Sequence, residues 1–234
     1  MCETSPIVGP SRTGETMGDG GYVMYLFQRT VTLRGGARKP IAWAIEINKL
    51  VNDLGGVEVG LWSTAFGFPL GTVVWSARVD SRAALAQVTA KLMADDAYHS
   101  LVEKGQEFVT TPGQDSLRQL VHAESPSPAP PPVGASVSLI TATPNPGQIT
   151  KALGWGVEIT TMYSRITGAP ASFYADAYGQ FGQLTWITPH ADFAAADAAN
   201  DALQANPEYL ASIDGAGAMF VPGSGMQGLA TRIA

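Results

Sequence analysis

Apolar residues follow two different periods along the chain, and the periods alternate in a regular order. Residues 22–33 are rich in β-branched and aromatic side chains, which predicts a strand. From Pro40 the apolar positions change to helical spacing, and a Gly-Gly pair is expected to end this helix. Its apolar face consists of Trp43, Ile47, Leu50 and Leu54. Residues 57–63 and 71–77 then predict two strands joined by a loop that contains Gly and Pro.

Two helices and a strand complete this unit. The pair Asp80-Ser81 supplies an N-cap for a helix that ends at Met93. Residues 95–96 begin a shorter helix, and residues 106–110 are predicted to form a last strand. The order is β-α-β-β-α-β, which is that of the ferredoxin-like split unit. The second half repeats these signals, with Asp192 as the helix cap.

Many residues recur in the same order about half a chain apart. Residues 43–47, WAIEI, return 112 positions later as WGVEI at residues 155–159. Further matches keep this offset, or an offset of 111 after one deletion: Gly56 and Gly168, Trp62 and Tyr174, Phe66 and Tyr178, Gly71 and Gly182, Trp75 and Trp186, Leu92 and Leu203, Tyr98 and Tyr209. Matches that keep one order over so many positions indicate a duplicated domain.

A Pro-rich segment separates the two copies. Residues 124–134 contain five of the chain's 16 prolines and predict an extended, semi-rigid spacer. We therefore expect a first ferredoxin-like unit over residues 21–123 and a second over residues 135–234. Residues 1–20 have little periodicity and predict a flexible tail.

Composition limits the classes of function. The chain has 234 residues, of which 45% are hydrophobic, which is enough to bury a core. Its single cysteine, Cys2, excludes an intrachain disulfide framework. With 14 basic against 20 acidic residues, a nucleic-acid partner is not expected, and no segment has the length of a membrane span. The first residues lack the layout of a signal peptide, so we expect a cytoplasmic protein.

The end of each unit resembles a known superfamily. The segments are VVWSARVDSRAALAQVTAKLMADDAYHSLVEKG and LTWITPHADFAAADAANDALQANPEYLAS. In both, a tryptophan-bearing strand leads through a short turn to a capped helix and then to a brief helix with an aromatic residue. This arrangement is similar to the dimeric α/β-barrel superfamily, especially its antibiotic-biosynthesis-monooxygenase branch. The resemblance implies an α+β fold in which two ferredoxin-like units pair their sheets into a barrel, here within one chain. A homodimer of such chains is a further expectation.

Aromatic residues at matching strand positions are the first candidates for substrate contact. A tryptophan within a strand is more often part of the core, but the resemblance places Trp75 and Trp186 in a substrate cavity. Trp62 and Tyr174 match each other on the preceding strand and could line the same space. The second unit adds a polar set around its strand loop, which consists of Asp176, Tyr178 and Gln183. We expect substrate binding by these seven residues, and we favour the second unit as the working one.

Three residues are candidates for proton transfer. Glu46 and Glu158 match each other beside the apolar face of the first helix, where burial would raise a carboxyl pKa; a solvated glutamate is the alternative. His190 precedes a helix cap and titrates near neutral pH; a loop histidine without a role is the alternative. Together with His99 and His122 it forms no spaced pair typical of a metal site, so no metal is expected.

The expected function is oxygenation of a planar aromatic polyketide-type substrate, by hydroxylation or by oxidative ring opening. Electron-rich phenolates can react with dioxygen themselves, so the protein needs mainly to bind, deprotonate and exclude water. Resemblance to the ring-opening oxygenases of angucycline pathways implies reduced flavin (FADH2 or FMNH2) as a cosubstrate supplied by a flavin reductase, and no tightly bound cofactor. Two alternatives stay open. One is a cyclase, isomerase or dehydratase on a similar substrate, and the other is a non-catalytic module that binds an apolar ligand.

Overall fold

Two units with the same order of elements make up the chain. The computed structural model describes residues 24–34, 38–125 and 130–234, so the expected tail over residues 1–20 lies outside the described residues. The first unit contains β1 (Tyr25–Thr32), α1 (Arg38–Gly55), β2 (Val59–Phe66), β3 (Thr72–Val79), α2 (Arg82–Met93), α3 (Asp96–Gly105) and β4 (Gln114–Ala123). The second contains β5 (Ser136–Ala142), α4 (Ile149–Thr167), β6 (Ser172–Tyr178), β7 (Leu184–His190), α5 (Phe193–Gln204), α6 (Pro207–Ala216), the short 3-10 turn η1 (Gly217–Met219) and β8 (Met226–Arg232).

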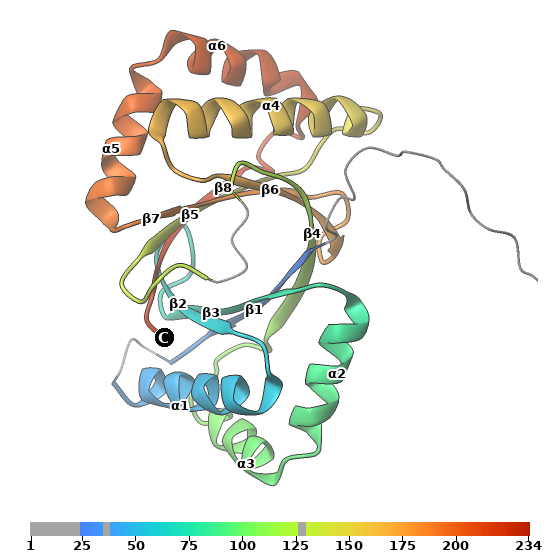
Figure 1. Cartoon of the computed structure of the whole chain (residues 1–234), viewed down its shortest axis with the longest axis vertical. Coiled ribbons are helices and arrows are strands. Elements are labelled where there is room, and N and C mark those ends of the chain that lie inside the picture. Colours follow the sequence, from blue (N-terminus) through green and yellow to red (C-terminus); the bar gives the residue numbers. More distant parts are fainter. Residues whose placement is uncertain (1–23, 35–37, 126–129) are drawn as a thin grey trace, which may run out of the picture.

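The eight strands close into one antiparallel barrel. Their order is β1-β3-β2-β8-β5-β7-β6-β4, so each unit supplies four neighbouring strands and the units meet at two seams, β2–β8 and β4–β6. Closure pairs the strand edges that each unit would otherwise expose. Figure 1 shows the barrel in the centre, with α1, α2 and α3 on one side and α4, α5 and α6 on the other. The predicted fold, two ferredoxin-like units forming a barrel within one chain, is confirmed.

Strand alternation divides the barrel residues between two buried environments. In β3, Trp75 packs in the core beneath α1, whereas Val74 and Ser76 line the barrel interior. In β7, Trp186 faces the helices, and Ile187 faces the interior. A cavity can therefore form on either face of the same strand.

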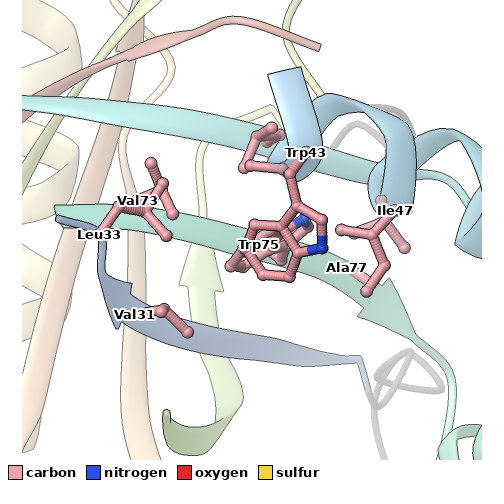
Figure 2. Close-up of a cluster of buried hydrophobic side chains, with 10 residues drawn as sticks. Val31, Leu33, Trp43, Ile47, Val73, Trp75 and Ala77 are labelled. Carbon is pink, nitrogen blue, oxygen red and sulfur yellow. The ribbon is translucent and has the colours of Figure 1, made fainter. Parts of the chain in front are cut away.

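The space between sheet and helices in the first unit is filled by a hydrophobic core. Trp43 of α1 lies against Trp75 of β3, with ring centroids 6.1 Å apart and planes at 78°. The Trp43 indole Nε1 donates to the carbonyl oxygen of Leu101 in α3 at 2.8 Å. Gly105 ends α3 against the same ring, where a Cβ would come within 2.3 Å of the indole. Figure 2 shows this cluster, in which Val31, Leu33, Ile47, Val73 and Ala77 surround the two tryptophans.

Side-chain caps account for several helix starts. The Ser81 hydroxyl accepts from the backbone N–H of Ala84 at 3.0 Å, and Asp192 accepts from that of Ala195 at 2.8 Å. Both predicted N-caps are therefore confirmed. Such caps satisfy backbone donors that the first helical turn leaves unpaired.

The last strand of the first unit lies later in the chain than predicted. Residues 106–110 form only an isolated bridge, between Val109 and Leu33, and the strand is β4. The prediction was wrong because β4 carries Arg118 on its inner face, where the side chain pairs with Asp176 inside the barrel. A charge at an inward position breaks the apolar alternation by which a strand is recognised.

The Pro-rich segment is anchored near one end of the barrel. Residues 126–129 lie outside the described residues, but residues 130–132 line the barrel interior. The buried Arg232 guanidinium donates to the carbonyl oxygen of Pro131 and, from Nη2, to Glu58 at 3.1 Å. The end of the spacer is thus tied to the last strand.

Candidate functional site

A cavity of about 450 Å³ lies between the sheet of the second unit and its helices. Strands β5 and β7 supply one wall, and α4, α5 and α6 supply the others. The volume falls within the ~300–1,000 Å³ typical of small-molecule sites. Among the described residues that line this cavity, none carries a charge. We call it the helix cavity; its larger apolar members include Trp155, Ile159, Trp186, Leu203, Ile213 and Phe220.

Aromatic rings gather on one side of the helix cavity. Trp155 and Trp186 meet edge to face with centroids 5.7 Å apart, and Phe220 lies 5.5 Å from Trp155. Phe173 stacks on Trp186 at 4.9 Å. Gly156 lets α4 approach this stack, because a Cβ there would come within 2.2 Å of the Phe173 ring. The result is a wall suited to a planar aromatic ligand.

Two phenols project into the same space. Tyr163 of α4 and Tyr209 of α6 both line the helix cavity. Burial raises the pKa of Tyr163 to about 12, partly offset by a hydrogen bond with Thr188, and burial also raises the pKa of Tyr209. Both side chains are therefore neutral at physiological pH and can donate to a carbonyl or phenolate oxygen.

Ser138 of β5 connects the helix cavity to a buried histidine. Its hydroxyl lines the cavity and lies 3.1 Å from Nε2 of His190, which is 7% exposed. Burial lowers the pKa of His190 below its usual value, so the imidazole is neutral at pH 7 and can accept a proton. A phenol bound beside Ser138 can pass its proton through this hydroxyl to His190.

Three of the four matching positions in the first unit are aliphatic or phenyl side chains, and the fourth is Tyr25. The register of β5 against β7 repeats that of β1 against β3, so the pairs Ser136–His190 and Ser138–Thr188 correspond to Tyr25–Val79 and Phe27–Ala77. A row of four polar side chains therefore faces the helices only in the second unit. Buried polar groups lower stability unless they are hydrogen-bonded, and this row is bonded: Ser136 donates to the Asp192 carbonyl oxygen at 2.8 Å, and Ser138 lies within hydrogen-bond distance of His190.

The helices that cover the helix cavity carry smaller side chains than the matching helices of the first unit. At the 111-residue offset, Leu85, Val88 and Leu101 of the first unit correspond to Ala196, Ala199 and Ser212 of the second. The smaller side chains in α5 and α6 leave the volume that larger ones help to fill in the first unit. Ser212 also accepts from the Trp155 indole Nε1 at 3.0 Å, whereas Trp43 donates to a backbone carbonyl.

The four predicted aromatic contacts are not brought together. Trp186 lines the helix cavity, and its counterpart Trp75 is packed in the core of the first unit (Figure 2). Trp62 and Tyr174 face the barrel interior instead. In the strand registers they lie opposite Val74 and Thr185, one residue before Trp75 and Trp186, so alternation directs them to the other face.

The predicted polar set of the second unit lies away from the helix cavity. Asp176 forms a buried ion pair with Arg118, with 2.9 Å between Oδ1 and Nε. Burial raises the pKa of Asp176 and lowers that of Arg118. Tyr178 is 58% exposed and accepts from Arg82, and Gln183 bonds within its own loop.

The two predicted glutamates are on helix surfaces. Glu46 is exposed and bonds to Lys104 Nζ at 2.9 Å, and Glu158 is exposed on α4. Of the three candidates for proton transfer, His190 is the one placed behind a cavity wall. Within residues 24–34, 38–125 and 130–234, no group of three or more His, Cys, Asp or Glu side chains could hold a metal ion. None of the helices described there is long and apolar enough to cross a membrane.

A second cavity, of about 340 Å³, occupies the barrel interior. We call it the barrel cavity. Its lining includes Gln28, Trp62, Ser76, Leu139, Tyr174 and Ile187, together with Glu58, Arg78 and residues 130–132.

Comparisons with known proteins identify the fold. No described protein family and no curated protein matches the sequence. A solved structure from Fusobacterium nucleatum, of a protein provisionally named a monooxygenase, matches with a TM-score of 0.68 at 11% identity over 92% of this chain and 94% of that one. This chain has the dimeric α/β-barrel fold. A similarly named protein from Lactobacillus acidophilus gives 0.58 at 14% identity over 90% and 94% of the two chains, and an anthrone oxidase-like protein gives 0.61 at 14% over 92% and 93%.

Sequence reasoning missed Ser138, Thr188 and Tyr163. A signal for the first of them was present, because serine alternates with apolar residues over residues 136–139 and places the hydroxyls on one face. Aligning this strand with β1 would have set Ser138 against Phe27. Tyr163 replaces Val51 at the helix offset of 112, which is a change visible in the repeat itself.

Proposed function

We propose that this chain is an oxygenase that takes a planar, uncharged aromatic polyketide-type substrate into the helix cavity and hydroxylates it or opens one of its rings. The observation that carries the proposal is an aromatic cavity with no charged lining that contacts a Ser138–His190 pair. The printed name of one structural neighbour, an anthrone oxidase-like protein, is in keeping with this substrate class.

Binding follows from the lining of the cavity. The rings of Trp155, Trp186 and Phe220 offer edges and faces to a planar substrate. Tyr163 and Tyr209 are neutral donors for a ring oxygen. A carboxylated substrate would enter without a counter-charge, which is costly in an apolar site, so the cavity selects uncharged polycyclic phenols and ketones.

The chemistry begins with removal of a proton. His190, acting through Ser138, accepts it from a bound phenol or enol, and the neutral phenols stabilise the anion that forms. The electron-rich anion then reacts with dioxygen. For anthrone the overall change is anthrone plus O2 to anthraquinone plus water, which balances without an added reductant. Ring hydroxylation, and ring opening that begins with insertion of one oxygen atom, each place one atom of O2 in the product and reduce the other to water. Unlike anthrone oxidation, both therefore need two electrons and two protons, which we propose are supplied by reduced flavin as a cosubstrate.

The test is anthrone turnover with and without oxygen. Purified chain is given anthrone with and without oxygen, in the absence of flavin, and anthraquinone formation and oxygen uptake are recorded. A parallel aerobic assay adds reduced flavin and records hydroxylated or ring-opened product. We expect one O2 consumed per anthraquinone, at a rate well above the uncatalysed oxidation. Oxygen-independent conversion of a polyketide substrate would instead identify a cyclase, isomerase or dehydratase. Binding without turnover of any aromatic substrate would identify a binding module.

The two matched tryptophans provide a control for the location of the site. Trp186→Phe removes an indole from the helix cavity, and Trp75→Phe removes one from the core of the first unit. Because one aromatic contact contributes ~0.5–1.5 kcal/mol, we expect Trp186→Phe to raise the KM for anthrone about 3–10-fold. Trp75→Phe should lower the melting temperature and leave KM unchanged. Equal losses that follow the melting temperature would contradict the placement of the site.

A further inference from the structure

The barrel cavity lies on the opposite face of β5 and β7 from the helix cavity. Val137, Leu139 and Ile187 line the first, while Ser138 and Trp186 line the second. We propose that the barrel cavity is a second binding site, for an apolar molecule that carries a carbonyl oxygen. This proposal does not depend on the reaction assigned to the helix cavity.

Gln28 presents a donor to the barrel cavity. Arg118 donates from Nη1 to the Gln28 Oε1 atom, and a guanidinium can only donate. The amide oxygen must therefore face Arg118, which leaves the Nε2 group for another acceptor. Arg118 is itself held by its buried ion pair with Asp176, so the orientation of the Gln28 amide is fixed.

Ser76 presents a second donor by the same reasoning. The Trp62 indole Nε1 donates to the Ser76 hydroxyl at 2.8 Å, and an indole N–H can only donate. Ser76 must accept this bond, so its own proton needs an acceptor elsewhere. The side chain is buried, and it lines the barrel cavity.

The two donors are neighbours on one face. Gln28 and Ser76 lie directly opposite each other in the β1–β3 register. In the part of the chain that the structure describes, neither the Gln28 Nε2 group nor the Ser76 hydroxyl proton is given an acceptor. Ser76 is buried and Gln28 is half-buried. A donor that is shielded from water and has no acceptor is costly, and one carbonyl oxygen can accept from both groups.

The surroundings fix the rest of the ligand. Apolar side chains line the same cavity as the two donors: Leu26, Val74, Leu139, Ile187 and Ala230. A volume of about 340 Å³ is at the lower end of known small-molecule sites. The ligand is therefore a compact ketone, quinone or ester with an apolar body.

The test compares two probes that differ only in the carbonyl group. Equilibrium dialysis of the full chain is carried out with 9-fluorenone and with fluorene. Two hydrogen bonds of ordinary net strength favour fluorenone about tenfold or more. Because the helix cavity also accepts polycyclic ketones, the dialysis is carried out in an Ala196→Leu background, which fills part of that cavity. We expect the preference to remain in this background and to be lost when Ser76→Ala or Gln28→Met is added. Tyr163→Phe, which removes a donor from the helix cavity, is the matched control and should retain the preference.

A further variant addresses the stability of the chain. Ser76→Ala leaves the Trp62 N–H without an acceptor and could unfold the protein, so Ala230→Leu provides a variant that fills the cavity and keeps both donors. We expect Ala230→Leu to weaken the carbonyl-selective binding at least tenfold, in a protein whose circular dichroism spectrum is unchanged. Equal binding of both probes to the wild type would overturn the proposal. Loss of the preference in Tyr163→Phe, with its retention in Ser76→Ala, would place carbonyl recognition in the helix cavity and overturn it as well.

Discussion

At the scale of single residues, the proposed reaction depends on one neutral imidazole. Burial holds the pKa of His190 below its usual value of 6.5, so the ring still accepts protons somewhat below that pH. We expect kcat/KM for anthrone to be level from pH 8 to about 6.5 and to fall only at lower pH, as the ring becomes protonated. His190→Gln should lower kcat ~10²–10⁴-fold and remove the acid limb. Near-normal turnover by this variant, or an unchanged acid limb, would exclude His190 as the proton acceptor.

Single residues also show how far the sequence alone leads. Trp186 and His190 were accessible to prediction, because one is matched between the copies and the other replaces an apolar residue. The orientation of Trp62 and Tyr174 was not, since a one-residue difference in register sends a side chain to the opposite face of a strand. Register is set by the pairing of strands from distant segments, which no single segment encodes.

At the scale of elements, the width of the helix cavity is set by small residues in α5. Ala196→Leu introduces the residue that the first unit carries at the matching position, Leu85. We expect the added side chain to fill part of the cavity and raise the KM for anthrone at least tenfold, with little change in melting temperature because the first unit accommodates leucine there. Ala198→Leu, at an exposed position of the same helix, is the control. Unchanged substrate affinity in Ala196→Leu would show that α5 does not border the binding site.

Elements marked by residues next to them in the sequence were predicted correctly, whereas elements that depend on contacts with distant residues were not. The caps at Ser81 and Asp192 lie next to the helices they begin, so they could be read from the sequence directly. Strand β4 was not predicted because Arg118, a charged residue, occupies an inward-facing position. It can do so because it pairs with Asp176, which lies 58 residues away in the sequence. A substrate cavity beside Trp186 was expected from the sequence. The row of polar residues Ser136, Ser138, Thr188 and His190 became apparent only when the strand registers of the two units were compared.

At the scale of the whole molecule, the two units depend on each other for closure. Each supplies an open four-stranded sheet, and the seams β2–β8 and β4–β6 complete the hydrogen bonding of both. The two cavities differ in whether one unit or both units line them. The helix cavity belongs to the second unit alone, whereas the barrel cavity is lined by strands from both units and exists only when they are joined. The duplication, together with the resemblance to barrel-forming proteins, predicted the barrel, but not that cavities would lie on both faces of its sheet.

The β4–β6 seam contains a buried ion pair, Arg118–Asp176, in which loss of one partner leaves the other charge uncompensated. Asp176→Asn leaves the Arg118 guanidinium buried beside a neutral partner, and loss of one member of a buried pair lowers stability by ~3–5 kcal/mol. We expect a loss of this size in urea unfolding. Asp115→Asn breaks the exposed Arg29–Asp115 pair and should lower stability by only ~0–1 kcal/mol. Replacing both seam residues, as Arg118→Met with Asp176→Leu, should recover most of the loss because no uncompensated charge remains. If Asp176→Asn were as mild as Asp115→Asn, the seam would be held by strand pairing alone.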